Sequence, residues 1–221
     1  MFDEIEMKEK NYKPDYKHLP PLGYDFLTSL YDYFCAVVGL GKGFKNKIVS
    51  SVNLKGNERI LDVGCGTGML LEALKRKYPN IKAMGIDPDR KALEIAARRL
   101  GRNGFDVELK QAFAESLPVD AESIDFAFSS LAFHHIPHSK KLRALKEAYR
   151  VLKSDGRFLI VDLNEGGNPL FRFFSFVFEE AELIKDNIKN LTSEFLPQAG
   201  FRNIRALFKH SWGIQGILAE K

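Results

Sequence analysis

The stretch LDVGCGTG, residues 61–68, constrains the fold more than any other part of this sequence. It follows an apolar run typical of a β-strand, RILDVG, and precedes the helical pattern MLLEALKRKY. Glycines let the backbone turn sharply and approach a ligand closely, and the first turn of a helix offers N–H groups without intrahelical partners. We therefore predict a strand–loop–helix unit that binds a ligand at the carboxyl end of its strand.

An acidic residue at the end of the next strand narrows the class of ligand. The strand pattern IKAMGID ends at Asp87, roughly 20 residues beyond the loop, where an acid suits the two hydroxyls of a ribose. The loop spacing is G-x-G-x-G rather than the G-x-G-x-x-G of dinucleotide sites, and the GK[ST] of a Walker loop is absent. Asp62, just before the glycines, would repel a pyrophosphate but suits an ammonium or sulfonium group. The alternative is a structural turn followed by an unrelated acid.

Strand and helix patterns alternate from Arg59 onward, which predicts βαβ units and a parallel sheet with helices on both faces. The last strand of this series reads GRFLIVDLN, beginning at Gly156. Residues 203–221 read as two strands with almost no room for a helix between them, so these must pair antiparallel near a sheet edge. A length of 221 residues fits one domain, which we place at residues 21–221, after a polar arm at residues 1–20.

Composition argues against several other classes of protein. The formal net charge of +4 comes without the long Lys/Arg runs of a nucleic-acid arm. The two cysteines, Cys35 and Cys65, form no CxxC pair and cannot complete a zinc site alone, so we expect reduced thiols in a cytoplasmic protein. The N-terminus MFDEIEMKEK is charged throughout, unlike a secretory signal, and no apolar run approaches the ~20 residues of a membrane span.

Four motifs together resemble a known family. LDVGCGTG, GIDPD, AESLPVDAESIDFAFSS and EAYRVLKSDGRFLIVD are similar, in order and spacing, to the successive motifs of class I S-adenosylmethionine-dependent methyltransferases. The branch they most resemble includes the ubiquinone/menaquinone-biosynthesis methyltransferases, and the resemblance covers residues from about 59 to 165. It implies an α/β, Rossmann-like fold: a seven-stranded, mostly parallel sheet with a C-terminal antiparallel hairpin and helices on both faces. It also implies S-adenosyl-L-methionine as cofactor and S-adenosyl-L-homocysteine as product.

The resemblance assigns the glycine loop to the methionine part and the ribose of the cofactor. On this reading Asp62 is the acid that leads the loop. The loop positions that match the family are Gly64, Gly66, Thr67 and Gly68.

Four further positions carry roles that the resemblance implies. Asp87 corresponds to the acid that accepts both ribose hydroxyls, and Pro88 to a residue that packs on the adenine. Ser129 and Ser130 match the end of the fourth strand, beside the methionine carboxylate and the methyl group.

Phe113 and Ala114 match the pair that flanks the edge of the adenine, and here the sequence departs from the family. Family members usually carry Asp or Asn at the position of Phe113, and that side chain accepts a hydrogen bond from the adenine amino group. Phenylalanine cannot accept it. Stacking or a backbone carbonyl can replace it in part, with a loss of ~1 kcal/mol or more of binding free energy.

Three of the five histidines lie in SSLAFHHIPH, residues 129–138. Pro137 prevents a regular helix from running through His134 to His138, and no acid in the stretch completes a metal shell, so we expect no metal site. His134 is the preferred candidate for a general base. His135 resembles a histidine that organises this loop in the branch, and we expect His138 at the surface.

Two segments outside the shared motifs bear on the substrate. LTSLYDYF resembles an element that closes over the cofactor in this branch, so we interpret residues 22–54 as a helical lid and Tyr31 as a second catalytic candidate. Residues 168–190 fall between the fifth and sixth strands, where related enzymes place a substrate-covering insertion. Its aromatic face can receive an apolar acceptor, a partner subunit or a membrane surface, or it can pack as an ordinary helix on the core.

The leading prediction is a methyltransferase that acts on a small or lipid-like acceptor, as a monomer or homodimer, with peripheral membrane contact left open. An RNA or protein methyltransferase is the second reading, although SSLAFH replaces the N/D-P-P-Y/F motif of amino-directed nucleic-acid enzymes. A cofactor-binding scaffold or regulatory subunit without turnover is the third interpretation, and Phe113 favours it. The sequence does not specify whether the acceptor atom is O, N, C or S.

Overall fold

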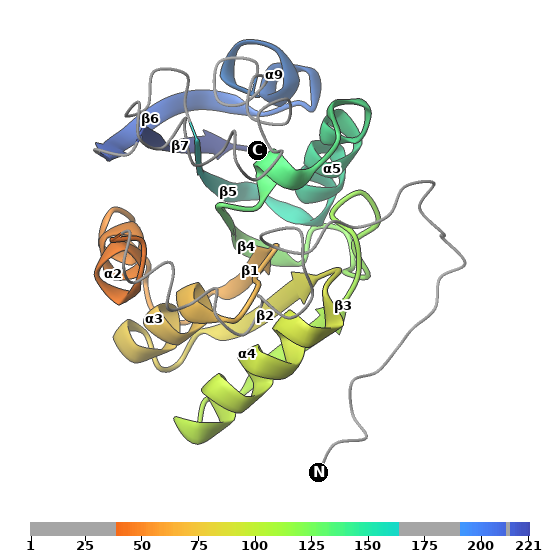
Figure 1. Ribbon diagram of the computed structural model, residues 1–221. Helices are drawn as coiled ribbons and strands as arrows, with labels where there is room; N and C mark the ends of the chain where they lie inside the picture. Colours follow the sequence, from red (N-terminus) through yellow and green to blue (C-terminus); the bar gives the residue numbers. More distant parts are fainter. Residues whose placement is uncertain (1–38, 164–190, 211–212) are drawn as a thin grey trace, which may run out of the picture.

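A computed structural model describes residues 39–163, 191–210 and 213–221 (Figure 1). The expected polar arm, the first part of the lid with Tyr31, and the expected insertion at 168–190 lie outside these residues. The described helices are α2 (Lys42–Ser50), α3 (Met69–Lys77), α4 (Arg90–Arg102), η3 (Phe133–His135), α5 (His138–Val151), η4 (Leu191–Phe195) and α9 (Leu196–Gln198).

Seven strands form one sheet, in the order β3-β2-β1-β4-β5-β7-β6. β1 to β5 are parallel, whereas β7 lies antiparallel between β5 and β6. The predicted parallel sheet and C-terminal antiparallel hairpin are therefore confirmed. The strands are β1 (Arg59–Val63), β2 (Lys82–Asp87), β3 (Val107–Gln111), β4 (Ile124–Ser130), β5 (Leu152–Leu163), β6 (Arg202–His210) and β7 (Ile214–Glu220).

The order of the strands reverses between β1 and β4. From β1 the chain passes to β2 and β3 on one side, and then returns to β4 on the other side. In open α/β sheets, ligands bind beyond the carboxyl ends of the strands at such a switch point. The topology therefore predicts a ligand site at the carboxyl ends of β1 and β4, after Val63 and Ser130.

Alternating side chains of the strands feed two hydrophobic cores, one on each face of the sheet. In β1, for example, Ile60 packs with α2, α3 and α4, whereas Leu61 packs with α5 and α9. Figure 1 shows these two groups of helices on opposite sides of the sheet. The apolar runs of the central strands are thus covered on both faces, as the sequence pattern predicts.

Local signals fix the ends of two helices near the site. Asp89 caps α4, because its side chain accepts hydrogen bonds from the backbone N–H groups of Lys91 and Ala92. Helix α5 begins directly after Pro137, as expected from the break that proline imposes.

One predicted boundary is wrong. β5 begins at Leu152 rather than at Gly156, because the chain pairs with β4 on both sides of an irregularity. Ile124 pairs with Leu152, and after a register shift Phe126 pairs with Arg157. The polar residues KSD between the two paired segments interrupt the apolar pattern, so a prediction from apolar runs places the start of the strand too late.

Candidate active site

The glycine loop turns directly over the end of β2. Gly64, Gly66 and Gly68 have φ values of 74°, 52° and 78°, a region that favours glycine. The backbone N–H groups of Gly64 and Cys65 donate to the Ile86 carbonyl at 2.8 and 3.0 Å. The loop is therefore held at the carboxyl edge of the sheet, between β1 and the start of α3.

Two of these glycines face different surroundings. A Cβ added at Gly64 would lie 2.3 Å from the Cβ of Ala132, in the loop after β4, so the two loops approach too closely for any side chain. Among the residues that the structure describes, and apart from the two chain neighbours, no atom lies within 4 Å of a Cβ added at Gly66. Gly64 thus serves packing, whereas Gly66 presents backbone to an open side where a ligand can approach.

Asp87 connects the loop to the end of β2. Its Oδ2 accepts from the Gly66 N–H at 2.8 Å and its Oδ1 from the Asp89 N–H at 2.9 Å. Burial raises the pKa of this carboxyl to about 6, although both backbone N–H groups act in the opposite direction. Each carboxylate oxygen can accept a second hydrogen bond, so Asp87 is oriented as an acceptor for hydroxyl groups.

Asp62 lies near the end of β1 and is 1% exposed. Burial raises the pKa of its carboxyl to about 7, while the ammonium of Lys45 lowers it and the charge of Asp87 raises it further. Its Oδ1 has no hydrogen-bond partner within the described part of the chain. A buried acceptor without a partner is unfavourable, so a ligand with a donor group would stabilise it.

The end of β4 adds two hydroxyls and a cation to this site. Ser129 is 1% exposed, and its Oγ has no hydrogen-bond partner in the described residues. Ser130 Oγ accepts from the Nζ of Lys45 at 2.9 Å. Lys45 comes from α2, and the sequence analysis did not identify it, because a lysine in a short helix usually faces solvent.

The chain turns sharply after β4. Leu131 is buried and has a φ of 59°, unusual for a residue with a side chain. Its N–H donates to the Val161 carbonyl of β5 at 2.8 Å, which holds the turn against the neighbouring strand. Strained backbone of this kind is concentrated at functional sites, and here it leads directly into the histidines.

His134 is bound to Asp162, a fully buried residue of β5. The Nδ1 of His134 lies 2.7 Å from Asp162 Oδ1, and its backbone N–H donates to Asp162 Oδ2 at 3.0 Å. Asp162 Oδ1 also accepts from the Leu163 N–H at 2.7 Å. Because a carboxylate only accepts, the proton of the neutral ring belongs on Nδ1 and the lone pair on Nε2. Sequence reasoning missed Asp162, since its partner becomes visible only once β5 lies beside β4.

The other two histidines of this stretch lie differently. His135 is half-buried, and its ring centroid lies 4.0 Å from that of His134. His138 is exposed, as expected, and its ring contacts Phe195 edge-on at 5.1 Å. No group of three or more His, Cys, Asp or Glu side chains suited to a metal ion occurs among the residues that the structure describes.

The positions assigned to the adenine lie at the ends of β2 and β3. The Ala112 N–H donates to the Asp87 carbonyl at 3.2 Å, so the segment that carries Phe113 and Ala114 leaves the sheet beside Asp87. Pro88, Phe113 and Ala114 are all half-buried. The structure thus gathers these three positions next to the acid.

Thr67 and Cys65 complete the loop. Thr67 is 4% exposed, and its carbonyl accepts from Arg99 Nε of α4 at 2.9 Å. Cys65 is buried, and burial raises the pKa of its thiol above the ordinary value, so it stays a protonated packing group.

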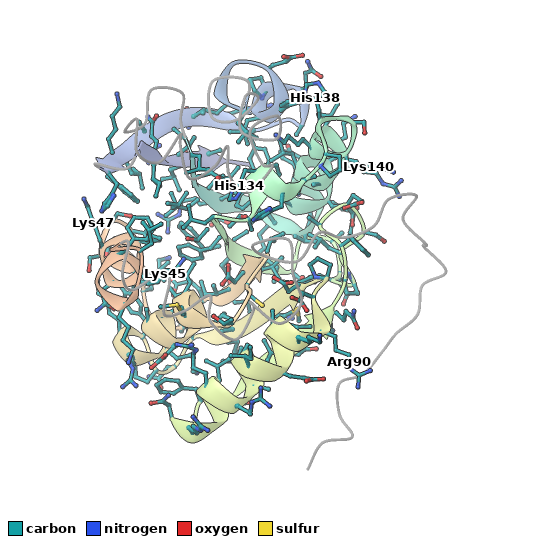
Figure 2. All side chains as sticks on the ribbon, viewed as in Figure 1. Lys45, Lys47, Arg90, His134, His138 and Lys140 are labelled. Atoms are coloured by element: carbon teal, nitrogen blue, oxygen red, sulfur yellow. The ribbon has the colours of Figure 1, made fainter. Side chains whose placement is uncertain are left out.

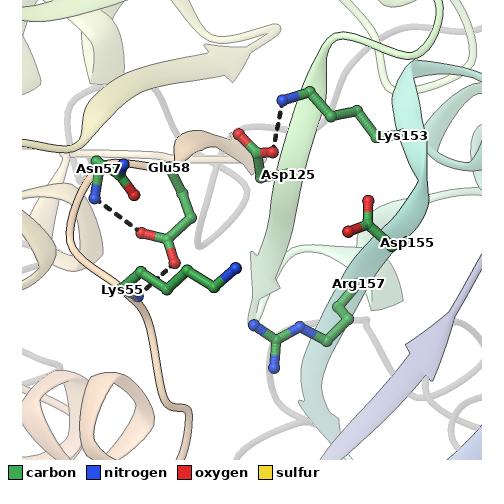
Figure 3. Close-up of a pocket in the computed structure, with 7 residues that line it drawn as sticks. All are labelled: Lys55, Asn57, Glu58, Asp125, Lys153, Asp155 and Arg157. Carbon is green, nitrogen blue, oxygen red and sulfur yellow. Dashed lines mark hydrogen bonds and ion pairs between the residues drawn. The ribbon is translucent and has the colours of Figure 1, made fainter.

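A separate pocket of about 300 Å³ lies at the opposite edge of the sheet, where β1, β4 and β5 begin (Figure 3). Its carboxylates are already engaged: Glu58 accepts from three backbone N–H groups, and Asp125 pairs with Lys153 at 2.6 Å. This pocket is remote from the switch point. The candidate active site is therefore the edge that carries Asp62, Asp87 and the glycine loop.

The residues at this edge fit the cofactor that the resemblance implies. Asp62 Oδ1 and Ser129 Oγ are buried polar atoms without a hydrogen-bond partner in the described residues. Asp87 offers two carboxylate oxygens that backbone N–H groups hold in place. Gly66 leaves backbone accessible. The two acids suit the ammonium, the sulfonium and the ribose hydroxyls of S-adenosylmethionine. The serine hydroxyls and the ammonium of Lys45 suit the carboxylate of the cofactor.

Comparisons with known proteins show the family to which the chain belongs. A family model described as a methyltransferase domain matches residues 60–156. The demethylmenaquinone methyltransferase of Lactobacillus johnsonii is 28% identical over 199 residues, which cover 79% of this chain and 81% of that protein. The ubiquinone/menaquinone biosynthesis C-methyltransferase UbiE of Syntrophotalea carbinolica is 30% identical over 166 residues, 73% of this chain and 67% of that protein.

A solved structure supports the same fold. The crystal structure of a SAM-dependent methyltransferase from Aquifex aeolicus has a TM-score of 0.65 and 23% identity, covering 80% of this chain and 88% of that one. In the described residues, none of the helices is both long and apolar enough to span a membrane.

Proposed function

The chain belongs to the class I S-adenosylmethionine-dependent methyltransferases, and from that premise we propose that it methylates a small or lipid-like acceptor whose reacting group carries an ionisable proton. The observation that carries this proposal is the His134–Asp162 pair, which follows directly after β4. The names of the relatives add support, because one is a demethylmenaquinone methyltransferase and the other a C-methyltransferase of ubiquinone/menaquinone biosynthesis.

When bound, S-adenosylmethionine supplies a methyl group on a positively charged sulfur. The chain's own residues bind the cofactor and orient it toward the acceptor. Asp87 offers its two oxygens to the ribose hydroxyls, and Asp62 offers a carboxylate to the cationic end. Ser129 and Ser130 lie at the end of β4, on the acceptor side of this arrangement. Positioning of this kind, with exclusion of water, accelerates group transfer between bound partners.

His134 is the proposed base. Asp162 holds the imidazole by its Nδ1, so Nε2 is the nitrogen that accepts a proton from the acceptor. A phenolic or quinol hydroxyl loses its proton readily, which makes its oxygen or the neighbouring ring carbon nucleophilic. A neutral amine already carries a lone pair and does not need this help. The pair therefore favours a hydroxyl-bearing aromatic acceptor over an amine, and His135 is assigned to support of the His134 ring.

Two finer parts of the assignment stay proposals. A monomer or homodimer with peripheral membrane contact would suit a lipid-like acceptor. A cytoplasmic location is supported by the two cysteines, which form no CxxC pair, and by the buried, protonated state of Cys65.

The test is a screen for transfer of a radiolabelled methyl group into fractions of a cell extract, separated into lipid, small-molecule, RNA and protein pools. We expect label in the lipid or small-molecule pool, and much less label at limiting cofactor with Asp87→Ala as the matched control. Label confined to RNA or protein would contradict the proposed acceptor class. Binding of the cofactor with no labelled pool would favour a regulatory subunit.

A further inference from the structure

Positive charge gathers on one face of the molecule, on the outer side of α2, α3 and α4. These helices cover the same face of the sheet (Figure 1). Among the described residues of these helices one acid is exposed, Glu94, and its Oε1 pairs with Nε of Arg90 at 3.3 Å. The exposed cations of the same helices are Lys42, Lys47, Arg76, Lys77, Arg90, Lys91, Arg98 and Arg102.

The helices on the opposite face do not share this excess. In the described residues of α5, η4 and α9, the exposed charged side chains are Arg143, Lys146 and Glu194. The formal net charge of the whole chain is +4, which is smaller than the excess of exposed cations on α2, α3 and α4 alone. The positive charge is therefore a property of one face and not of the surface in general.

Helix dipoles explain only part of this arrangement. Cations in the last turn of a helix interact favourably with its dipole, and Lys47, Lys77 and Arg102 lie there. Lys42 and Arg90, however, begin α2 and α4, where the same dipole disfavours a cation, and neither first turn holds an acid. Figure 2 shows Lys47 on the outer side of α2 and Arg90 pointing away from the body of the protein. The cations thus extend along both helices, as a binding surface requires.

The chemistry of this face favours a lipid surface over a nucleic acid. None of the exposed side chains in the described residues of α2, α3 and α4 is aromatic, whereas proteins that bind single strands stack bases on aromatic rings. A double helix is commonly read by an element inserted into a groove, which helices packed side by side on a sheet do not provide. An anionic bilayer is itself a broad surface, and it attracts Lys and Arg without specific contacts.

The same helices border the candidate active site. α2 reaches that site with its inner side, where Lys45 Nζ donates to Ser130 Oγ at 2.9 Å. α4 begins directly after its cap Asp89, whose N–H donates to the Asp87 carboxylate. A membrane against the outer side of these helices would therefore lie beside the edge of the sheet at which the acceptor must arrive.

We propose that the outer face of α2, α3 and α4 binds the anionic surface of a lipid membrane. The inference rests on the proposed function, because a membrane is the source of a lipid-like acceptor. It assigns membrane contact to a defined face, and to charge rather than to insertion of apolar side chains. Because each exposed cation strengthens binding by only about fivefold, the contact is reversible and sensitive to salt.

The test measures sedimentation of the full chain with vesicles of phosphatidylcholine, alone or mixed with phosphatidylglycerol. We expect binding to the mixed vesicles at about 0.1 M salt and its loss at about 1 M, where the Debye length falls from about 10 Å to about 3 Å. The double variant Lys42→Gln, Arg98→Gln should bind about 25-fold more weakly. The control Lys146→Gln, Lys209→Gln removes the same charge from exposed positions outside the three helices, and should stay within about twofold of the unsubstituted chain.

Equal losses for the two double variants would overturn the assignment, because net charge rather than this face would then govern binding. Equal binding to phosphatidylcholine alone, or no binding to the mixed vesicles, would overturn it as well, and so would a short RNA that the mixed vesicles fail to displace. If the first variant does not fold, as judged by circular dichroism, Lys47→Gln, Arg102→Gln carries the same comparison. Failure of the proposed function is a separate result, namely a methyl label confined to RNA or protein.

Discussion

Asp162 binds both the ring and the backbone of His134, with Oδ1 2.7 Å from Nδ1 and Oδ2 3.0 Å from the backbone nitrogen. The acid is fully buried in β5, and the histidine follows the strained turn after β4. A single carboxylate thus fixes the tautomer of the imidazole and the path of the loop that carries it. Such a pair is suited to general-base catalysis, and it can be tested by separate substitutions.

His134→Gln should lower the single-turnover rate of methyl transfer by roughly 10²–10⁴-fold and leave the affinity for S-adenosylhomocysteine within a few-fold. The reason is that glutamine keeps a polar side chain but cannot accept the acceptor's proton. His135→Gln, at the adjacent position, should instead lower the melting temperature. A wild-type rate for His134→Gln across pH 6–8 would mean that His134 is not the base, and Tyr31 would be the next residue to test.

Asp162→Asn should lower the transfer rate and shift its pH profile, because an amide no longer stabilises a protonated imidazole. The apparent pKa of the base in the rate profile should fall relative to the unsubstituted enzyme. A merely structural role would lower thermal stability and leave the position of the profile unchanged. Rate measurements from pH 5.5 to pH 9, at saturating cofactor, separate the two outcomes.

Gly64→Ala should destabilise the protein through a steric clash. The added Cβ would lie 2.3 Å from Ala132, and the φ of 74° is itself unfavourable for alanine. We expect a fall of several degrees in melting temperature, at about 2–4 °C for each kcal/mol in a protein of this size. A Cβ added at Gly101 in α4 meets no described atom within 4 Å outside its own helix turn and chain neighbours, so Gly101→Ala should raise stability by about 0.5–1 kcal/mol. Equal melting temperatures for both variants would contradict the packing seen between the two loops.

The sequence predicted the sheet, the glycine loop and the place of Asp87 at the end of β2, because each has a local signal. Apolar runs mark strands that are buried on both faces, and glycines with positive φ mark the turn between β1 and α3. Lys45 and Asp162 have no such signal. A lysine in a short helix and an acid within LIVDL meet Ser130 and His134 only when α2 and β5 pack beside β4. The early start of β5 escaped for a similar reason, because its first residues pair across an irregularity.

The stability of the ligand-free protein should depend on pH through two buried acids. The pKa values of Asp62 and Asp87 in the folded state are about 7 and about 6, above the ordinary value of 3.8. Between about pH 4 and about pH 7 the folded state holds protons that the unfolded chain has lost, so these groups make the free energy of unfolding fall as pH rises. Asp62→Asn should make this fall shallower, most clearly above pH 6. Thermal melts of both proteins, compared at each pH, isolate the effect from that of the remaining acids.

Cofactor affinity should show the opposite trend, because binding favours the ionised carboxylates. Asp62, between the charges of Lys45 and Asp87, must lose its proton to hold a cationic group. We expect the affinity for S-adenosylmethionine to rise with pH up to about 7 and then to level off. Asp62→Asn should bind more weakly and lose the upper part of this dependence. An affinity that falls between pH 6 and pH 7 in the unsubstituted protein would contradict the role given to Asp62.

The most direct test of the cofactor site is calorimetry with S-adenosylhomocysteine and NAD on the unsubstituted chain and on two neighbouring variants. Asp87→Ala removes the proposed acceptor of both ribose hydroxyls. Asp89→Ala removes the cap of α4, at about 1 kcal/mol of stability, and a nearby charge that raises the pKa of Asp87, but it leaves the Asp87 carboxylate in place. We predict that S-adenosylhomocysteine binds more tightly than NAD. We also predict at least tenfold weaker binding for Asp87→Ala, with the fold intact by circular dichroism, and near-normal binding for Asp89→Ala. Tighter binding of NAD, or an unchanged affinity in Asp87→Ala, would contradict this cofactor site.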